Sequence, residues 1–203
     1  MIIILLLIVS ATVSSAQSEE QKTAVPNKLF ISYGPAGAFL KTENSDGSFG
    51  GGSALTLGWN FTPDFSLYLT SMGYHMDKAN FTNSEPDTYF RWGINGLGFR
   101  YSFMNWSRTR LYADGAFLQS SLRPDLPERV VFSGNGFSAG AGIQHFVAPQ
   151  WSVSAGIVYV YSHFRKKVED DRTIDFKMTG HGVNVNAGFA WHPYANRNNS
   201  PGR

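Results

Sequence analysis

The sequence predicts an all-β protein, an eight-stranded antiparallel up-and-down transmembrane β-barrel. Three observations predict this fold class: charges avoid the long segments, side-chain polarity alternates with a period of two, and connections alternate between short and long. Charged residues make up 16% of the chain, against about 25% in soluble proteins. Of the 32 charged residues, four lie in the interior of the alternating segments: Arg91, Arg100, Arg110 and Asp114.

The N-terminal residues have the features of a secretory signal. An apolar run over residues 1–9 is followed by small residues that end in Ser14-x-Ala16, a pattern that signal peptidase cleaves. The run is shorter than the roughly 20 residues of a transmembrane helix. The sequence therefore predicts a signal peptide over 1–16, a periplasmic segment over 17–27, the barrel over 28–192 and a periplasmic tail over 193–203.

Alternation of apolar residues at every second position predicts the strands. Leu55, Leu57 and Trp59 share one face of a segment, and Val183 and Val185 share one face of another. The predicted strands span 28–40, 49–61, 65–76, 89–103, 109–120, 133–147, 151–164 and 178–192. Bulges or bends are expected in the first, third and fourth strands, at Pro35, Gly73, Gly93, Gly96 and Gly98.

The connections between these strands decide the topology. Tight turns are predicted at 62–64, 105–108 and 148–150, and longer polar loops at 41–48, 77–88, 121–132 and 165–177. All tight turns then lie at one end and all long loops at the other, as in outer-membrane barrels. Closure is required because lipid cannot satisfy the open edge of a sheet.

A soluble lipocalin-like barrel with an apolar interior is the competing interpretation. The faces opposite the apolar ones carry small uncharged residues such as Ser152, Ser154 and Gly156, which suit a narrow lumen better than a water-facing surface. Aromatic residues gather at both ends of the strands, as interfacial belts do. The expected belts are Phe61, Phe65, Phe103, Phe146, Trp151, Trp191 and Tyr194 near the turns, and Phe39, Phe49, Tyr74, Tyr89, Phe90, Trp92, Tyr159, Tyr161 and Phe164 near the loops.

The alternation, the turn-loop asymmetry and the aromatic-rich last strand over 183–191 resemble the small OmpA/OmpX-like family of outer-membrane barrels. The resemblance implies a non-enzymatic protein in the outer membrane of a Gram-negative bacterium, exported through its signal peptide. It further implies a contribution to envelope integrity and presentation of surface loops. Outer-membrane lipid and the outer-membrane assembly machinery are the implied partners.

Three charged residues are expected to point into the lumen: Arg100, Arg110 and Asp114. Eight strands leave an interior only wide enough for side chains, so a general diffusion pore is not expected. Buried charges are costly unless they are paired. We therefore expect Asp114 to offset Arg100 or Arg110 in a structural network, with a gated ion path as the alternative.

The loop predicted at 165–177 holds nine charges of mixed sign. Its basic start, Arg165, Lys166 and Lys167, would lie just beyond the aromatic rim, where lipopolysaccharide phosphates could accept charge-assisted hydrogen bonds. A solvated loop without a ligand is the alternative. An adhesin or partner-binding role would use the same loop together with 77–88 and 121–132.

Several chemistries find no support in the residues. The absence of cysteine excludes disulfides and thiolate sites, and a net charge of +2 with no basic stripe argues against nucleic acid. His163 and His181 lack a third metal ligand, so no metal and no cofactor is expected. A lipid A modifying enzyme remains an alternative. Deacylase-like catalysis would need a His-x-Ser pair on one strand face, and none of the five histidines is part of such a pair.

Overall fold

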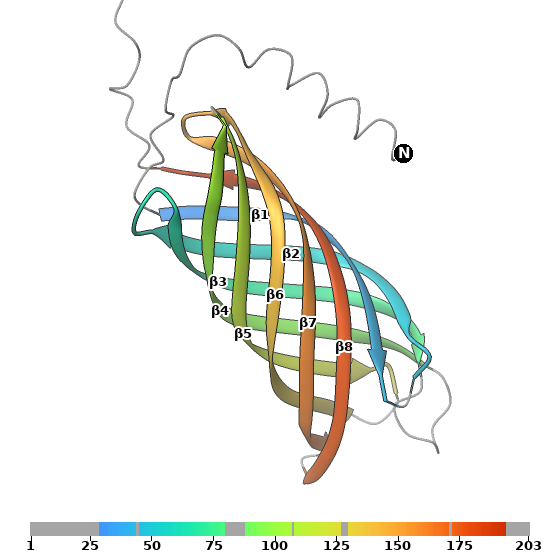
Figure 1. Ribbon diagram of the computed structural model, residues 1–203. Coiled ribbons are helices and arrows are strands. Elements are labelled where there is room, and N and C mark those ends of the chain that lie inside the picture. The colour runs from blue at the N-terminus through green and yellow to red at the C-terminus, as the bar shows by residue number, and fades with distance from the viewer. Residues whose placement is uncertain are drawn as a thin grey trace, which may run out of the picture.

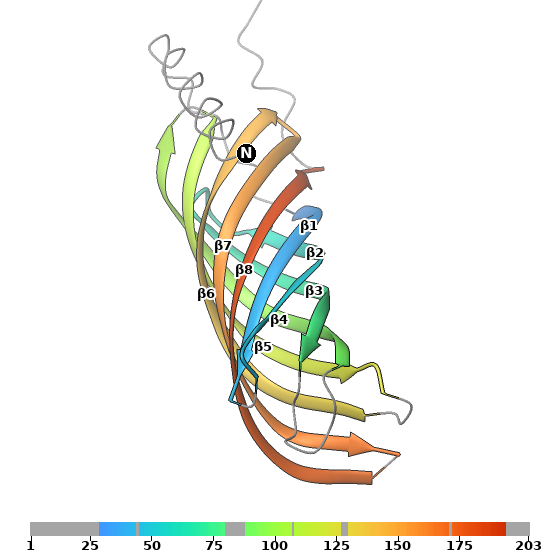
Figure 2. The same ribbon diagram turned by 90° about the vertical axis from the view of Figure 1, so that its right-hand side faces the viewer.

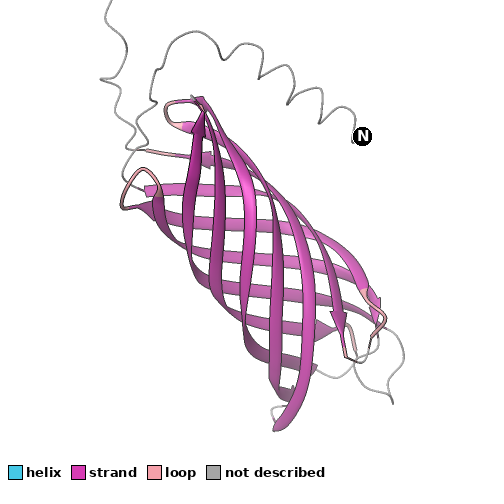
Figure 3. Cartoon of the chain, in the orientation of Figure 1, coloured by secondary structure: helices cyan, strands magenta, loops and turns pink. Residues whose placement is uncertain are grey.

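The computed structural model describes residues 29–43, 45–79, 88–106, 108–126, 130–170 and 172–193, and nearly all of them lie in strands (Figure 3). The predicted signal peptide, the 17–27 segment and residues 194–203 of the tail lie outside the described residues. The strands are β1 (Leu29–Thr42), β2 (Ser48–Asn60), β3 (Phe65–Ala79), β4 (Thr88–Trp106), β5 (Thr109–Pro124), β6 (Val130–Ala148), β7 (Trp151–Glu169) and β8 (Arg172–Trp191).

The eight strands form one closed barrel in sequence order, in which every neighbouring pair is antiparallel (Figures 1 and 2). Strand β8 returns to pair with β1, with Lys41 opposite His181 and Ile31 opposite Trp191. The predicted up-and-down barrel is therefore confirmed. Within the described residues, no helix is long and apolar enough to cross a membrane.

Alternation along the strands places large apolar side chains on the outer wall of the barrel. Leu57, Phe117 and Val185 all point outward and are well exposed. An outer wall of this kind would be unstable in water but is suited to lipid. The soluble lipocalin-like interpretation, which requires these side chains inside, is wrong.

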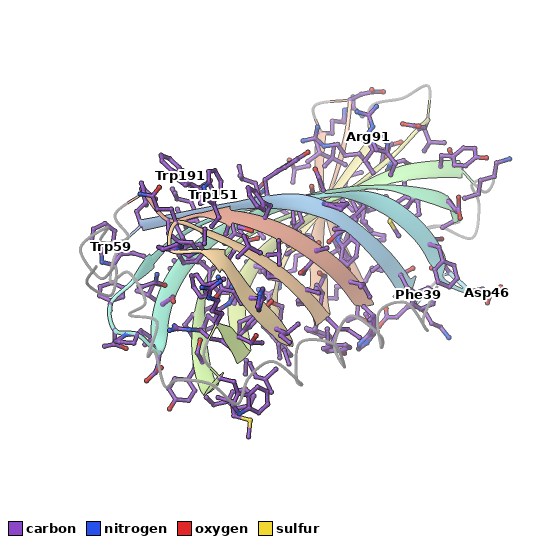
Figure 4. The ribbon with its side chains drawn as sticks, turned by 90° about the horizontal axis from the view of Figure 1, so that it is seen from above. Phe39, Asp46, Trp59, Arg91, Trp151 and Trp191 are labelled. Carbon is purple, nitrogen blue, oxygen red and sulfur yellow. The ribbon has the colours of Figure 1, made fainter. Side chains whose placement is uncertain are left out.

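The two ends of the barrel differ in their connections. At the turn end, residues 61–64, 107–108 and 149–150 join the strands. Figure 4 shows Trp59, Trp151 and Trp191 gathered at this end, with Trp151 and Trp191 in ring contact at 6.2 Å between centroids. At the opposite loop end lie Asp46 and Arg91.

The strands extend further toward the loop end than the sequence predicts, and residues 165–177 do not form a loop. Strand β7 continues to Glu169 and β8 starts at Arg172, and these two residues are directly opposite each other. Asp170 occupies the left-handed region with φ of 44°, which Asp tolerates better than most residues. This hairpin is the lowest part of the molecule in Figures 1 and 2. The charge run suggested a loop, but a strand beyond the membrane tolerates charge.

Five residues assigned to the aromatic belts point into the barrel instead. They share the inward-facing parity of their strands and are buried: Tyr74, Phe90, Trp92, Phe146 and Phe164. Tyr194 lies outside the described residues. The position of a residue along a strand predicts its depth, but only its parity decides between lipid and lumen.

The expected bulges are also absent from the predicted positions. Pairing stays in register through Pro35, Gly73, Gly93, Gly96 and Gly98. The register instead shifts nearer the strand ends, after Met76, Ser102, Ser133, Phe146 and Phe164. Some glycines make room for neighbouring side chains, because a Cβ at Gly98 would overlap the Tyr68 ring.

Candidate functional site

An ion pair lies inside the barrel where β4 and β5 face each other. Arg100 and Asp114 are directly opposite in the register, and the Nη2 of Arg100 donates to Oδ2 of Asp114 at 3.1 Å. The guanidinium also lies over the ring of Tyr112, 3.9 Å from its centroid. The side chains are only 17% and 8% exposed, so removal of either partner would leave a charge in a poorly solvated place.

A small cavity surrounds this pair. Its volume is about 60 Å³, and hydroxyl and amide groups from several strands line it, among them Thr56, Thr70, Ser138 and Asn186. Each water molecule occupies roughly 30 Å³ in the liquid. The cavity therefore has room for a few water molecules at most and none for a nutrient-sized solute.

Arg110 belongs to a different part of the interior. Its Nη1 donates to the carbonyl oxygen of Pro63 at 2.8 Å, and its guanidinium lies 5.3 Å from the centroid of the Phe146 ring. Of the two arginines that could offset Asp114, the structure therefore brings Arg100 to the carboxylate. Arg110 instead ties the β2–β3 turn to the base of the barrel.

Sequence reasoning missed a serine–histidine pair at the turn end. Ser152 is the second residue of β7 and His192 directly follows β8. Ser152 Oγ lies 3.0 Å from His192 Nε2. Gln144 donates to the same Oγ at 2.8 Å. Both members of the pair are at most 2% exposed, and His192 is in ring contact with Phe30 and Phe146. No substrate reaches this hydroxyl in the observed packing, so the pair closes the base of the barrel.

The loop side of the interior is filled by apolar side chains. Trp92 is fully buried, packs on Tyr74 at 5.5 Å between ring centroids and donates from Nε1 to Ser120 Oγ at 2.8 Å. We call the largest fully buried residues here the apolar plug: Leu40, Tyr74, Phe90, Trp92, Ile94, Leu122, Phe132, Val160, Phe164 and Met178. Together with the ion pair, the plug leaves no room for a wide channel.

The basic residues predicted to contact lipopolysaccharide lie on the hairpin of β7 and β8. Arg165 and Lys166 are exposed. Lys167 is less available, because its Nζ lies 3.1 Å from Glu169 Oε2 and 6.0 Å from the centroid of the Phe132 ring.

The histidine pair considered as a metal site lies on the outer wall. His181 Nδ1 is 2.6 Å from the hydroxyl of Tyr159, and His163 is opposite Thr179. Among the described residues, no group of three or more His, Cys, Asp or Glu side chains is placed to hold a metal ion.

A closed eight-stranded antiparallel ring with an apolar outer wall defines the class of small transmembrane β-barrels. The family model described as "Outer membrane protein beta-barrel domain" matches residues 2–190. The chain belongs to this family and is an outer-membrane protein of a Gram-negative bacterium.

Solved structures show the same fold at low sequence identity. Neisserial surface protein A matches with a TM-score of 0.64 and 16% identity, over 80% of this chain and 96% of the other. OprG from Pseudomonas aeruginosa matches with a TM-score of 0.58 and 9% identity, over 83% and 97%. Ail from Yersinia pestis matches with a TM-score of 0.51 and 15% identity, over 81% and 99%. No curated protein sequence matches this chain.

Proposed function

We propose that this protein is a non-enzymatic barrel that contributes to envelope integrity and acts through its outer wall and its loop end. The observation that carries this proposal is the filled interior. The apolar plug occupies the loop side, the Arg100–Asp114 pair occupies the middle, and the cavity beside that pair has a volume of about 60 Å³. A solute has no path through such an interior, so the accessible chemistry lies outside it.

Burial of the serine–histidine pair found among the described residues supports the non-enzymatic assignment. The serine–histidine pair of Ser152 and His192 is buried, and a nucleophile needs access to its substrate as well as a base. The lipid A modifying alternative would require these residues or others to open toward lipid. Unaltered lipid A after overexpression is the expected result, and a new lipid A species would contradict the assignment.

Partner binding at the loop end is the second candidate. Pairing of β1 with β8 ends at Thr42 and Gly180, and Glu43 N donates to the carbonyl oxygen of Thr179 just beyond it. Among the described residues, none pairs with residues 172–178 of β8 on that edge. An unpaired edge offers backbone donors and acceptors to another chain. Ail, which shares the fold, has been solved in complex with the heparin analogue sucrose octasulfate. Arg165 and Lys166, on the same hairpin, would bind an anionic partner such as lipopolysaccharide.

One complementation experiment separates the two candidates. A strain lacking the gene is complemented with the wild type or with a variant in which residues 166–175 are replaced by a two-residue Asn-Gly turn. If envelope integrity depends on the barrel, both proteins restore resistance to detergent. If the hairpin binds the partner that matters, only the wild type does so. Failure of the wild type to restore resistance would contradict the integrity role.

The lipopolysaccharide contact has its own test. The variant R165Q/K166Q/K167Q removes three positive charges from the hairpin, and weaker binding of lipopolysaccharide is expected. Because Lys167 already pairs with Glu169, R165Q/K166Q should account for most of the loss. Unchanged binding would rule out this contact.

A further inference from the structure

The outer wall over β3 to β6 carries successive cross-strand rows of different chemistry. One row is apolar and consists of Leu69, Leu97, Phe117 and Phe137; the next row toward the loop end is polar and uncharged and consists of Ser71, Asn95, Gln119 and Asn135. A row of small residues follows, with Gly73, Gly93, Ser121 and Ser133. A basic row ends the series, with His75, Arg91 and Arg123.

A depression in the wall joins the apolar row to the polar row. Its volume is about 760 Å³. On one side it is lined by Leu57, Leu69 and Phe117, and on the other by Asn95 and Gln119. The lining is therefore amphipathic, with its polar part nearer the loop end.

The polar row has unused hydrogen-bonding capacity. Among the described residues, the side chains of Ser71, Asn95, Gln119 and Asn135 make no hydrogen bonds with one another or with other groups, and all four are exposed. Hydrocarbon offers no partner to such groups. Uncharged amide groups can form hydrogen bonds with the carbonyl and hydroxyl groups that lie between the acyl chains and the headgroup of a lipid.

The basic row holds an electrostatic conflict that an anion would relieve. Arg91 and Arg123 are directly opposite each other, and like charges in this arrangement are destabilising. Asp125 reaches Arg91 only at 3.8 Å in a largely exposed pair, and Arg123 has no ion pair among the described residues. His75 lies opposite Arg91 on the other side. Two acidic residues lie nearby: Asp77 is two residues beyond His75 in β3, and Asp125 is two residues beyond Arg123, just after β5 ends.

The order of the rows follows the order of groups in a membrane lipid. Successive rows are about 6.8 Å apart along a strand, so the polar and basic rows are separated by roughly 13 Å between Cα atoms. The long arginine side chains can span part of this distance. Tyr89, exposed and one row beyond Arg91, is typical of the membrane interface.

We propose that this strip binds a phosphate-bearing acyl lipid of the outer leaflet. Arg91 and Arg123 hold the phosphate, and Asn95 and Gln119 donate to the carbonyl of the acyl linkage. An acyl chain lies in the depression against Leu69 and Phe117. The site goes beyond the proposed envelope role and is separate from the contact at Arg165 and Lys166.

Native mass spectrometry of the protein purified in detergent tests the site. Three probes with identical chains are compared: diacyl phosphatidic acid, diacylglycerol and the dialkyl ether analogue of phosphatidic acid. The wild type is expected to retain phosphatidic acid best, because diacylglycerol lacks the phosphate and the ether analogue lacks the carbonyl. Equal retention of all three would overturn the proposal.

Variants assign the effect to the rows. R91Q/R123Q should lower retention of phosphatidic acid about fivefold per arginine, whereas R91K/R123K should keep most of it. N95L/Q119L should remove the preference for ester over ether. K41Q/R108Q, which removes two exposed charges outside both the rows and the hairpin of β7 and β8, is the matched control and should leave retention unchanged.

Four results would overturn the proposal. The first is full retention in R91Q/R123Q, with folding verified by the mobility difference between boiled and unboiled samples. The second is an equal loss in the control variant, which would indicate general charge attraction. The third is a wild-type dimer that N95L/Q119L converts to a monomer, since the rows would then be a self-association surface. Displacement of the lipid by inorganic phosphate alone would likewise rule out recognition of the acyl part.

Discussion

On its loop side the barrel interior is packed with large apolar side chains, whereas on its turn side it holds charges, hydroxyls and a small cavity. Trp92 and Phe132 on the loop side are fully buried. Arg100 and Asp114 further down keep some exposure and lie beside the cavity. The two regions close the same lumen by different physics, hydrophobic packing in one and charge pairing in the other.

The two regions contribute differently to the stability of the barrel. Packing gains free energy from every buried methylene and excludes water. An ion pair gains little net free energy on burial but costs much when one partner is lost. A one-residue slip of β4 against β5 would also misalign Arg100 and Asp114. We therefore expect the plug to dominate stability and the ion pair to help fix the register.

The largest expected effect comes from Trp92→Ala, which breaks the plug. The substitution removes the contact with Tyr74 and the hydrogen bond to Ser120, and should lower the free energy of unfolding by about 3–5 kcal/mol. Urea unfolding in lipid vesicles measures this change. A loss below about 1 kcal/mol would show that the plug is loosely packed.

A somewhat smaller effect is expected from Asp114→Ala in the charged region. It leaves the Arg100 guanidinium without its carboxylate and should cost about 2–3 kcal/mol, since the polar cavity can admit some water. The double variant R100L/D114L is the control and should recover most of the loss, because no charge remains unpaired. If the single and double variants are equally destabilised, the pair contributes through packing alone.

Overpacking the plug provides a third comparison. A Cβ at Gly182 would overlap the Trp92 ring, so Gly182→Ala should destabilise the barrel by about 1–3 kcal/mol. Gly51, which has open space around its Cα, supplies the matched control, and Gly51→Ala should be nearly neutral. Equal effects in urea unfolding would contradict the packing described for Trp92.

The smallest effect is expected when an exposed arginine–aspartate ion pair is broken. Arg91 and Asp125 lie 3.8 Å apart and are mostly exposed, so Asp125→Ala should change the free energy of unfolding by less than about 1 kcal/mol. Added salt should reduce even that change. A loss as large as that of Asp114→Ala would mean that burial does not distinguish the two pairs.

The sequence predicts the outer wall better than the interior, for a physical reason. Lipid imposes the same requirement at every outward position, so Leu57, Phe117 and Val185 identify their faces by alternation alone. The interior is a three-dimensional packing problem. Phe90 and Trp92 could not be separated from Tyr89 until the parity of β4 was known.

The candidate site was predictable to different degrees. Arg100 and Asp114 were identifiable because charges inside an alternating segment need a partner, but the choice between Arg100 and Arg110 required the register. The pair of Ser152 and His192 joins residues far apart in sequence, and no local pattern marks it. The charged segment 165–177 was mistaken for a loop because charge reports exposure to water rather than backbone conformation.

Ion conductance of the protein inserted in planar lipid bilayers tests the central claim, a sealed interior, most directly. The structure predicts no discrete current steps above those of the bare bilayer, because the apolar plug and the Arg100–Asp114 pair block the lumen. Reproducible steps from the folded, heat-modifiable protein would contradict a sealed interior and favour a gated path through the charged region.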